Sequence, residues 1–247
     1  MIVQKFGGSS LATRELREIA IGRVLAAARE RRDPVVVVSA LGRAPSPYST
    51  DALAALVGSA PGSANRDLVL ACGELISAGL FAEELCARGV RATALSGAQA
   101  GIVTDDAHGD AEIVAVRPVL LERLVAEGVV PVVAGFQGST GDGRLTTIGR
   151  GGSDLTAVAV AWSLGNVPLE IYTDVDGVYD ADPREQPGAS AFERLSLRQL
   201  RDLARSGARV MQERAAEFAY RTGTSLRIIG LRSGLGTHVG GENVNPD

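Results

Sequence analysis

Residues 35–39 read VVVVS, an apolar run that ends at a single hydroxyl side chain. A strand of this composition is typical of a parallel sheet whose two faces are both covered by helices, because neither of its sides is suited to water. Similar short runs recur along the chain and alternate with longer segments in which apolar residues have helical spacing. Strands that alternate with helices predict an α/β protein with a mainly parallel sheet.

The pattern also places the individual elements. The predicted strands cover residues 2–6, 35–39, 92–96, 129–136, 169–175 and 225–229, followed by a short strand near 237–239. The predicted helices cover residues 13–32, 50–58, 66–88, 117–127, 153–164, 196–205 and 207–222. The loops at 42–50, 139–145 and 180–192 are rich in Gly, Pro, Ser and Asp, so we expect mobile lids there. We expect the glycine-rich tail to fray after its last strand.

Composition narrows the class of protein. A chain of 247 residues can bury a sizeable core, and its net charge of -4 gives no reason to expect nucleic acid or a membrane as a partner. Only 4% of the residues are aromatic, which makes base-stacking platforms unsuited to this chain. Its two cysteines do not form a disulfide framework, and the start of the chain does not have the pattern of a secretory signal. We therefore expect a cytoplasmic protein.

Two glycine-rich turns follow apolar strands and precede helices. They read KFGGSS (5–10) and GRGGSD (149–154). Such a turn brings backbone N–H groups and a helix N-terminus to one point, which suits an anion. Neither turn has the spacing of a Walker A loop or of a dinucleotide-binding motif. A tight strand-to-helix connection without a ligand explains each turn equally well when it is taken alone.

The first of these turns carries an unusual cation. The chain has 25 basic residues, and Lys5 is the only lysine among them. An ammonium is a compact point charge, whereas a guanidinium is a wide planar fork. A phosphoryl group in transfer needs positive charge close to its equatorial oxygens. We therefore interpret Lys5 as a phosphate-binding group rather than as a surface lysine.

A third segment, YTDVDGVYDADPR (172–184), holds four aspartates, two tyrosines and an arginine. Its acids lack the spacing and the terminal glutamate of an EF-hand loop, so a dedicated metal cage is not predicted. Hydroxyl and carboxylate groups at a strand end, with a tyrosine nearby, suit a nucleotide better.

Seven motifs occur in order along the chain: VQKFGGSS, VVVVSALGR…PYSTDAL, CGELIS, LSGAQAGIVTDDAH, VVAGFQGSTGDGRLTTIGRGGSD, IYTDVDGVYDADPR and SGARVMQERAAEFA. Together they resemble the catalytic domain of the aspartate kinases, in the amino acid kinase family, from residue 2 to about 239. The segment GR…PYSTDAL is most similar to the Gram-positive bacterial form.

The resemblance implies a three-layer α/β/α sandwich around an open, mainly parallel sheet, formed by one domain over residues 1–247. The N-terminal half, about 1–145, would hold the acid substrate, and the C-terminal half, about 146–247, would hold ATP. It implies transfer of the γ-phosphate of ATP to the side-chain carboxylate of L-aspartate. That carboxylate has a pKa of about 3.9 and is ionised near neutral pH, so no general base is needed. Accordingly, neither His108 nor His238 need act.

Roles are carried over from the motifs position by position. Lys5 and Asp154 would be catalytic, with Asp154 orienting Lys5. Glu74 would bind the substrate ammonium and Arg150 a substrate carboxylate, while Ser39 and Thr50 are further candidates for the substrate pocket. The residues implied to bind ATP are Lys5, Gly7, Gly8, Ser9, Gly151, Gly152, Ser153, Thr173, Asp174, Tyr179, Arg184, Arg209 and Val210. Mg²⁺ would be held mainly through the ATP phosphates, with no dedicated protein site.

Three features depart from the family pattern. Aspartate kinases usually continue into a pair of regulatory ACT domains, whereas this sequence stops at Asp247, so we expect no feedback control within it unless a separate regulatory subunit supplies it. The family lysine of GAKV is replaced by Arg209. The next segment reads MQERA (211–215) in place of a histidine or serine followed by proline, and the arginine-serine that ends the family's following strand is missing.

Three functions therefore stay open. The first is an ATP-dependent aspartate kinase that works as a stand-alone catalytic domain. The second is a sibling kinase of another small amino acid or carboxylic acid, and the third is a catalytically weak binding or regulatory subunit. The resemblance also implies a homodimer, because kinase domains of this family commonly pair.

Overall fold

The computed structural model describes residues 1–58, 62–181, 186, 188–208 and 211–240. Eight strands form its large sheet: β1 (Ile2–Phe6), β2 (Pro34–Val38), β3 (Ala92–Leu95), β6 (Val130–Ala134), β9 (Leu169–Thr173), β10 (Arg194–Leu195), β11 (Leu226–Gly230) and β12 (Gly236–Val239). Their order is β10-β12-β11-β9-β1-β2-β6-β3. Neighbouring strands are parallel except for the antiparallel pair β11 and β12.

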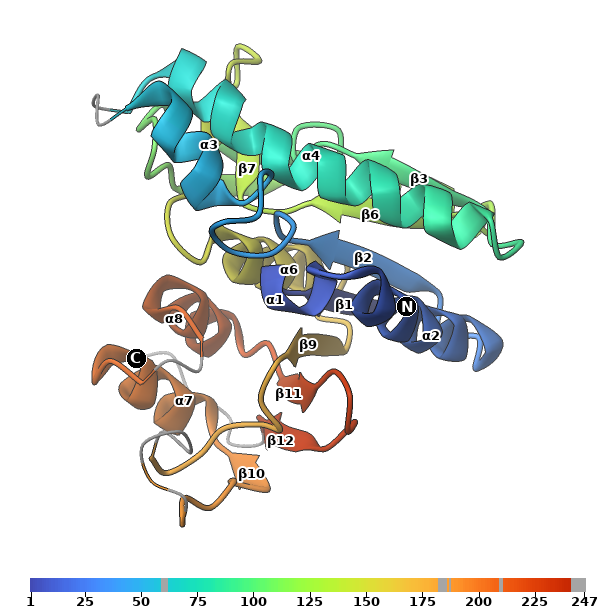
Figure 1. Cartoon of the computed structure of the whole chain (residues 1–247), viewed down its shortest axis with the longest axis vertical. Coiled ribbons are helices and arrows are strands. Elements are labelled where there is room, and N and C mark those ends of the chain that lie inside the picture. The colour runs from blue at the N-terminus through green and yellow to red at the C-terminus, as the bar shows by residue number, and fades with distance from the viewer. Residues whose placement is uncertain (59–61, 182–185, 187, 209–210, 241–247) are drawn as a thin grey trace.

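Helices cover both faces of this sheet (Figure 1). They are α1 (Gly8–Leu11), α2 (Arg14–Arg29), α3 (Thr50–Val57), α4 (Ala64–Cys86), α5 (Val119–Ala126), α6 (Gly152–Ser163), α7 (Leu197–Arg205) and α8 (Glu213–Thr222). One apolar cluster joins the sheet to α2 and α4, and a second joins its other face to α5, α6, α7 and α8. The three-layer α/β/α arrangement and the mainly parallel sheet are therefore confirmed.

The valine run of β2 shows why the sequence folds in this way. Alternate side chains of a strand point to opposite faces of the sheet. Val35 and Val37 accordingly belong to the cluster under α6, while Val36 and Val38 belong to the cluster under α2 and α4. All four valines are fully buried, so each face of the strand contributes to a separate core.

Hydroxyl side chains fix the starts of several helices. Each of the following side chains accepts a hydrogen bond from a backbone N–H in the first turn of the helix that follows it: Thr13, Ser49, Ser63 and Ser196. Such caps satisfy amide groups that have no partner within the helix. The helix predicted over residues 207–222 is shorter than expected, because α8 begins only at Glu213.

A second sheet was not predicted. Its strands are β4 (Ile102–Thr104), β5 (Ile113–Val116), β7 (Gln137–Ser139) and β8 (Leu145–Thr147), and their order is β5-β4-β7-β8. The glycine-rich segment 139–145 forms the turn of an antiparallel hairpin of β7 and β8. The backbone N–H of Thr140 donates to the Arg144 carbonyl at 2.9 Å, which closes the turn.

Each strand predicted for the large sheet is present in the structure, and its ends differ from the predicted ends by no more than two residues. Residues 241–247, for which fraying was predicted, lie outside the described residues. No helix in the described part of the chain combines the length and the apolar character that a membrane span needs.

Candidate active site

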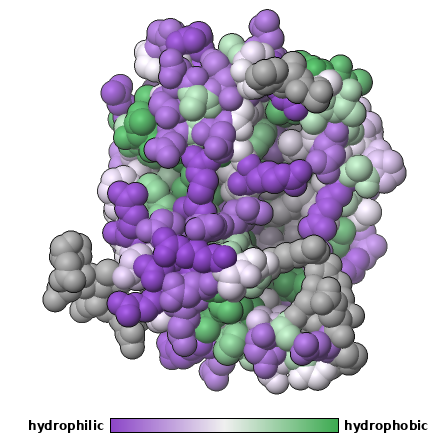
Figure 2. Space-filling view, turned by 90° about the vertical axis from the view of Figure 1, so that its left-hand side faces the viewer, coloured by the Kyte–Doolittle hydropathy of each residue, from purple (hydrophilic) through white to green (hydrophobic). Residues whose placement is uncertain are grey.

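A pocket of about 740 Å³ opens at the carboxyl ends of β1, β2 and β9. Carboxyl ends of neighbouring parallel strands are where ligands bind in open α/β sheets. Figure 2 views this end of the sheet and shows hydrophilic side chains around a recess. The pocket is lined by Lys5, Gly7, Gly8, Ser9, Ser39, Ala40, Gly42, Arg43, Thr50, Asp154, Ile171, Tyr172, Thr173, Asp174, Val175, Ala204, Arg205, Gly207, Ala208, Met211, Gln212 and Glu213.

An ion pair lies at the centre of this lining. The Nζ atom of Lys5, near the end of β1, lies 2.6 Å from the Oδ1 atom of Asp154, in the first turn of α6. Lys5 is only 8% exposed, because β1 is flanked by β2 and β9 and is covered on both faces. Its ammonium is therefore held at one point by a carboxylate rather than moving through solvent.

The glycine turn after β1 leaves room for this ammonium. A Cβ atom at Gly7 would lie 3.5 Å from the Lys5 Nζ atom, and a Cβ atom at Gly8 would lie 2.7 Å from the carbonyl oxygen of Ala40. A side chain at Gly8 would therefore push β1 and the turn after β2 apart. Gly7, Gly8 and Ser9 all line the pocket, as the phosphate-binding prediction requires.

The second glycine turn has a different position. Gly151 has a φ of 71° and caps α6, and a Cβ atom there would overlap the Gln212 side chain, at 1.7 Å from its Cγ atom. Ser153 packs against Gly135. Gly151, Gly152 and Ser153 are not among the residues that line the pocket, so this turn supports the site through Asp154.

Glu74 is a buried carboxylate with half of its hydrogen-bonding capacity unused. It lies on α4 and is 2% exposed. Its Oε1 atom accepts a hydrogen bond from the Ala40 N–H at 3.0 Å, next to Ser39 in the pocket lining, whereas Oε2 is buried and has no hydrogen-bond partner among the described residues. Burial raises the pKa of Glu74 to about 8, although the Ala40 N–H and the charge of Lys5 act in the opposite sense.

The other predicted acceptor residues are only partly brought together. Ser39 and Thr50 line the pocket. Arg150 is exposed and is not part of the lining. It belongs to the turn between β8 and α6, whose neighbours Gly149 and Gly151 both have positive φ.

On the nucleotide side, Thr173 and Asp174 line the pocket at the end of β9. Tyr179 does not line it, and its backbone instead pairs with that of Ala191. Arg184, Arg209 and Val210 lie outside the described residues.

One wall of the pocket runs from the end of α7 to the start of α8; Arg209 and Val210 of this segment were assigned to the ATP site from the sequence, but five other residues of the segment that line the pocket were missed. These residues are Gly207, Ala208, Met211, Gln212 and Glu213. The available signal was Gly207, which has a φ of 89° and ends α7. A helix predicted to run through this segment concealed it.

Comparison with known proteins identifies the family. The model of the amino acid kinase family matches residues 1–230. This chain belongs to the amino acid kinase family. Within that family, the chain is 42% identical over 231 residues to aspartokinase 1 of Bacillus subtilis, a match that covers 92% of this chain and 57% of that protein.

Further relatives and solved structures agree. Aspartokinase of Corynebacterium efficiens is 42% identical over 232 residues, covering 92% of this chain and 54% of the relative. The crystal structure of Escherichia coli aspartokinase III in complex with aspartate and ADP has a TM-score of 0.86 and 27% identity, covering all of this chain and 66% of that one. This family member thus spans about half the length of the curated relatives that it matches.

Proposed function

We propose that this chain is an aspartate kinase. A side-chain carboxylate oxygen of L-aspartate attacks the γ-phosphorus of ATP, the bond between that phosphorus and the β–γ bridging oxygen breaks, and the products are 4-phospho-L-aspartate and ADP. The similarity to proteins named aspartokinase supports the substrate, and the pocket supports the reaction class. The observation that carries the proposal is the ion pair of the buried Lys5 with Asp154 among the glycines at the end of β1.

Lys5 has the role of stabilising negative charge on the transferred phosphoryl group. Preorganised positive charge in a partly dry site stabilises a transition state more than the same charge does in water. Asp154 keeps the ammonium in place at 2.6 Å, so the charge needs little reorganisation when ATP binds. The peptide groups of Gly7, Gly8 and Ser9 supply a flat surface to which phosphates can approach closely.

The acceptor half is completed by its substrate. The unpartnered Oε2 atom of Glu74 is a suitable acceptor for the α-ammonium of aspartate, since that cation supplies both the hydrogen bond and the charge that the site lacks. We assign the α-carboxylate of aspartate to Arg150, whose guanidinium can bind a carboxylate in a bidentate manner. Ser39 and Thr50 provide hydroxyl groups on the same side of the pocket.

Magnesium would enter with the nucleotide. The described residues include no group of three or more His, Cys, Asp or Glu side chains arranged to hold a metal ion. The pocket does offer single carboxylates at Asp154 and Asp174, which fits an ion held mainly by the ATP phosphates. When bound, that ion would neutralise phosphate charge.

The two substrates are assigned to different halves of the chain. We propose one domain over residues 1–247, with the acid substrate bound by about 1–145 and the nucleotide by about 146–247. The pair of Lys5 and Asp154 joins the two halves. A homodimer is proposed as well, and sedimentation of the purified chain measures it directly.

The test is an ATP-consumption assay with Mg²⁺ against aspartate, glutamate, related acids and no acceptor, with hydroxylamine to trap acyl phosphate. We expect turnover and a trapped hydroxamate with aspartate alone. Turnover with a different acid would replace aspartate as the substrate and indicate a sibling kinase. Failure with every acid, in folded protein that still binds ATP, would contradict the proposal and favour a binding subunit.

A further inference from the structure

A second cavity lies at the opposite end of the large sheet from Lys5. It has a volume of about 440 Å³ and is bordered by the starts of β9 and β11 and by the end of β12. Its lining consists of Arg32, Asn166, Pro168, Leu169, Glu170, Arg194, Ser225, Leu226, Arg227, His238, Val239 and Gly240. The proposed kinase reaction uses none of these residues.

Three nitrogen-bearing side chains form a row across this end of the sheet. His238 on β12 lies directly opposite Arg194 on β10 and directly opposite Arg227 on β11. Side chains of directly opposite residues share one face of the sheet and lie close together, and like charges in such positions are destabilising. A row of this kind costs folding free energy unless something negative lies beside it.

The acidic residue next to this row already accepts hydrogen bonds from other side chains. Glu170 on β9 is the next residue in the register, directly opposite Arg227. Its Oε1 atom accepts a hydrogen bond from Arg32 at 3.2 Å, and its Oε2 atom accepts one from Gln4 at 2.9 Å and one from the Tyr172 hydroxyl at 2.8 Å. Glu170 therefore lies beside Arg227 in the cavity lining, but the hydrogen bonds of its side chain go to Arg32, Gln4 and Tyr172 and not to Arg194, Arg227 or His238.

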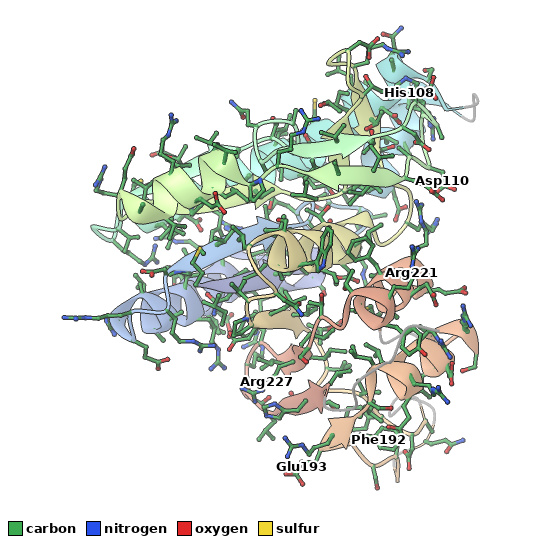
Figure 3. All side chains as sticks on the ribbon, turned by 180° about the vertical axis from the view of Figure 1, so that it is seen from behind. His108, Asp110, Phe192, Glu193, Arg221 and Arg227 are labelled. Atoms are coloured by element: carbon green, nitrogen blue, oxygen red, sulfur yellow. The ribbon has the colours of Figure 1, made fainter. Side chains whose placement is uncertain are left out.

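The row contains a hydrogen-bond donor without an acceptor and a histidine flanked by two guanidinium groups. The Nε atom of Arg227 is buried and has no hydrogen-bond partner among the described residues. Partial burial lowers the pKa of the His238 imidazole, and the guanidinium groups of Arg227 and Arg194 lower it further, while Glu193 acts in the opposite sense. Figure 3 shows from behind Arg227 on β11 and Glu193 just before β10.

We propose that this cavity is a binding site for a small oxyanion, with a carboxylate or phosphate group held between Arg194, Arg227 and His238. A guanidinium fork matches the two oxygens of either group. The bound anion would give the Arg227 Nε–H its missing acceptor and would remove the repulsion along the row. The inference stands on the register and the cavity alone, so it does not depend on the kinase proposal.

Two sources can supply this chemistry. The first is a free anion in solution. The second is the chain itself, since Glu242 and Asp247 follow Gly240 in the sequence and bear carboxylates. A version of the chain that ends at Gly240 distinguishes the two sources.

The experiment is a titration with inorganic phosphate, followed by the ring signals of histidine in NMR spectra. The chain has two histidines, so His238 reports on the cavity and His108, which is bonded to Asp67, serves as an internal reference. Saturating ADP keeps phosphate out of the Lys5 pocket, and sodium chloride at equal ionic strength controls for screening. We expect a saturable shift of His238 and a constant His108.

Variants make the assignment specific. Arg227→Gln and, separately, the exposed Arg194→Gln should weaken the saturable shift at least about tenfold, because each removes one charge-assisted contact. Arg221→Gln is the matched control, since Arg221 is an exposed arginine on α8, away from Arg227 (Figure 3). Thermal unfolding of each variant verifies that it is folded.

The outcomes separate cleanly. A saturable shift in the full chain identifies a free anion as the ligand. A shift only in the chain that ends at Gly240 identifies the chain's own carboxylates as the occupant, which is the same oxyanion site. The proposal is overturned if both chains show no saturable shift, or if Arg194→Gln responds as strongly as Arg221→Gln.

Discussion

The two sides of the proposed active site each contain a carboxylate with little exposure to solvent, and the two are satisfied in opposite ways. Asp154 contacts the ammonium of Lys5 at 2.6 Å. Glu74, on the proposed acceptor side, has one backbone N–H at 3.0 Å and an oxygen with no hydrogen-bond partner in the part of the chain that the structure describes. A carboxylate with a resident cation is part of the protein's fixed charge arrangement. A buried carboxylate without one is a position that a cationic substrate can complete.

Helix α4 carries a further carboxylate, Asp67, whose hydrogen bonds are all made by residues other than Lys5. Asp67 is fully buried in the first turn of α4. It accepts hydrogen bonds from the backbone N–H groups of Thr147 and Gly109, from the Thr147 hydroxyl at 2.7 Å and from His108 Nδ1 at 2.8 Å. Asp67 therefore joins α4 to β8, the strand that leads into the turn of Arg150.

The largest effect should come from changing the resident cation. We expect Lys5→Arg to retain the fold but to lower turnover at least about 100-fold, because a planar fork cannot occupy the position of a compact ammonium beside Asp154. Steady-state assays at saturating ATP and aspartate measure it. The exposed Arg14→Lys is the control for an exchange of the two cations. Turnover near that of the parent chain would remove Lys5 from the proposed role.

The next effect is on stability and concerns Asp67. Asp67→Ala should lower the free energy of unfolding by about 3 kcal/mol, because it leaves several buried donors without an acceptor. Urea denaturation provides the measurement. Asp51→Ala is a matched control, since Asp51 also lies in the first turn of a helix but is exposed. Equal losses in the two variants would show that Asp67 is not the joint between α4 and β8.

Changing Glu74 should affect substrate binding. We expect Glu74→Gln to raise the KM for aspartate about 30-fold, or ~2 kcal/mol, with little change in the KM for ATP, because a neutral amide cannot pair with an ammonium. Glu83→Gln, at an exposed position on the same helix, should change neither value. An unchanged aspartate dependence in Glu74→Gln would place the ammonium elsewhere.

The raised pKa of Glu74 predicts a pH dependence of stability. A carboxyl whose pKa rises from 4.5 to about 8 on folding binds its proton more tightly in the folded state. Its contribution is complete below pH 4.5 and is lost as the pH rises to about 8. In this window we expect stability to fall by up to about 1.4 kcal/mol per pH unit from this group.

Urea denaturation of the unliganded protein at several pH values tests this slope. Glu74→Gln cannot lose a proton, so its stability should depend less steeply on pH over the same window. Parallel curves for the two proteins would mean that Glu74 has an ordinary pKa in the folded chain.

The smallest effect probes a single donor to Asp67. Thr147→Val removes the hydroxyl that lies 2.7 Å from Oδ1 but keeps the shape and the backbone N–H, so we expect a loss of about 1 kcal/mol. Thermal or urea unfolding resolves such a change. Thr93→Val, at an exposed position on β3, should be neutral. A larger loss at Thr93 would reverse the proposed ranking of the two sites.

Much of this arrangement could be predicted from sequence, because local patterns determine it. The valines of β2 fixed a sheet buried on both faces, and the glycine turns placed Lys5 and Asp154 at one end of it. The four short strands of the second sheet could not be predicted, since three or four residues are too few to display a period.

Features that depend on contacts between distant segments could not be predicted from the sequence either. Gln212 and Glu213 line the pocket only because α8 begins later than its periodicity suggests. The row of Arg194, His238 and Arg227 depends on the register of strands separated by long stretches of chain. Nothing in the local sequence of any of these strands indicates that its neighbours bring similar charges.

That the chain contains a single lysine also makes its chemistry selective. Apart from the chain's own amino terminus, the ammonium of Lys5 is the sole primary amine in the sequence, and it lies in the wall of the pocket proposed to bind ATP. A reagent that acylates amines therefore has one internal target. Its reaction rate, with and without ATP, would report occupancy of the pocket through covalent labelling alone.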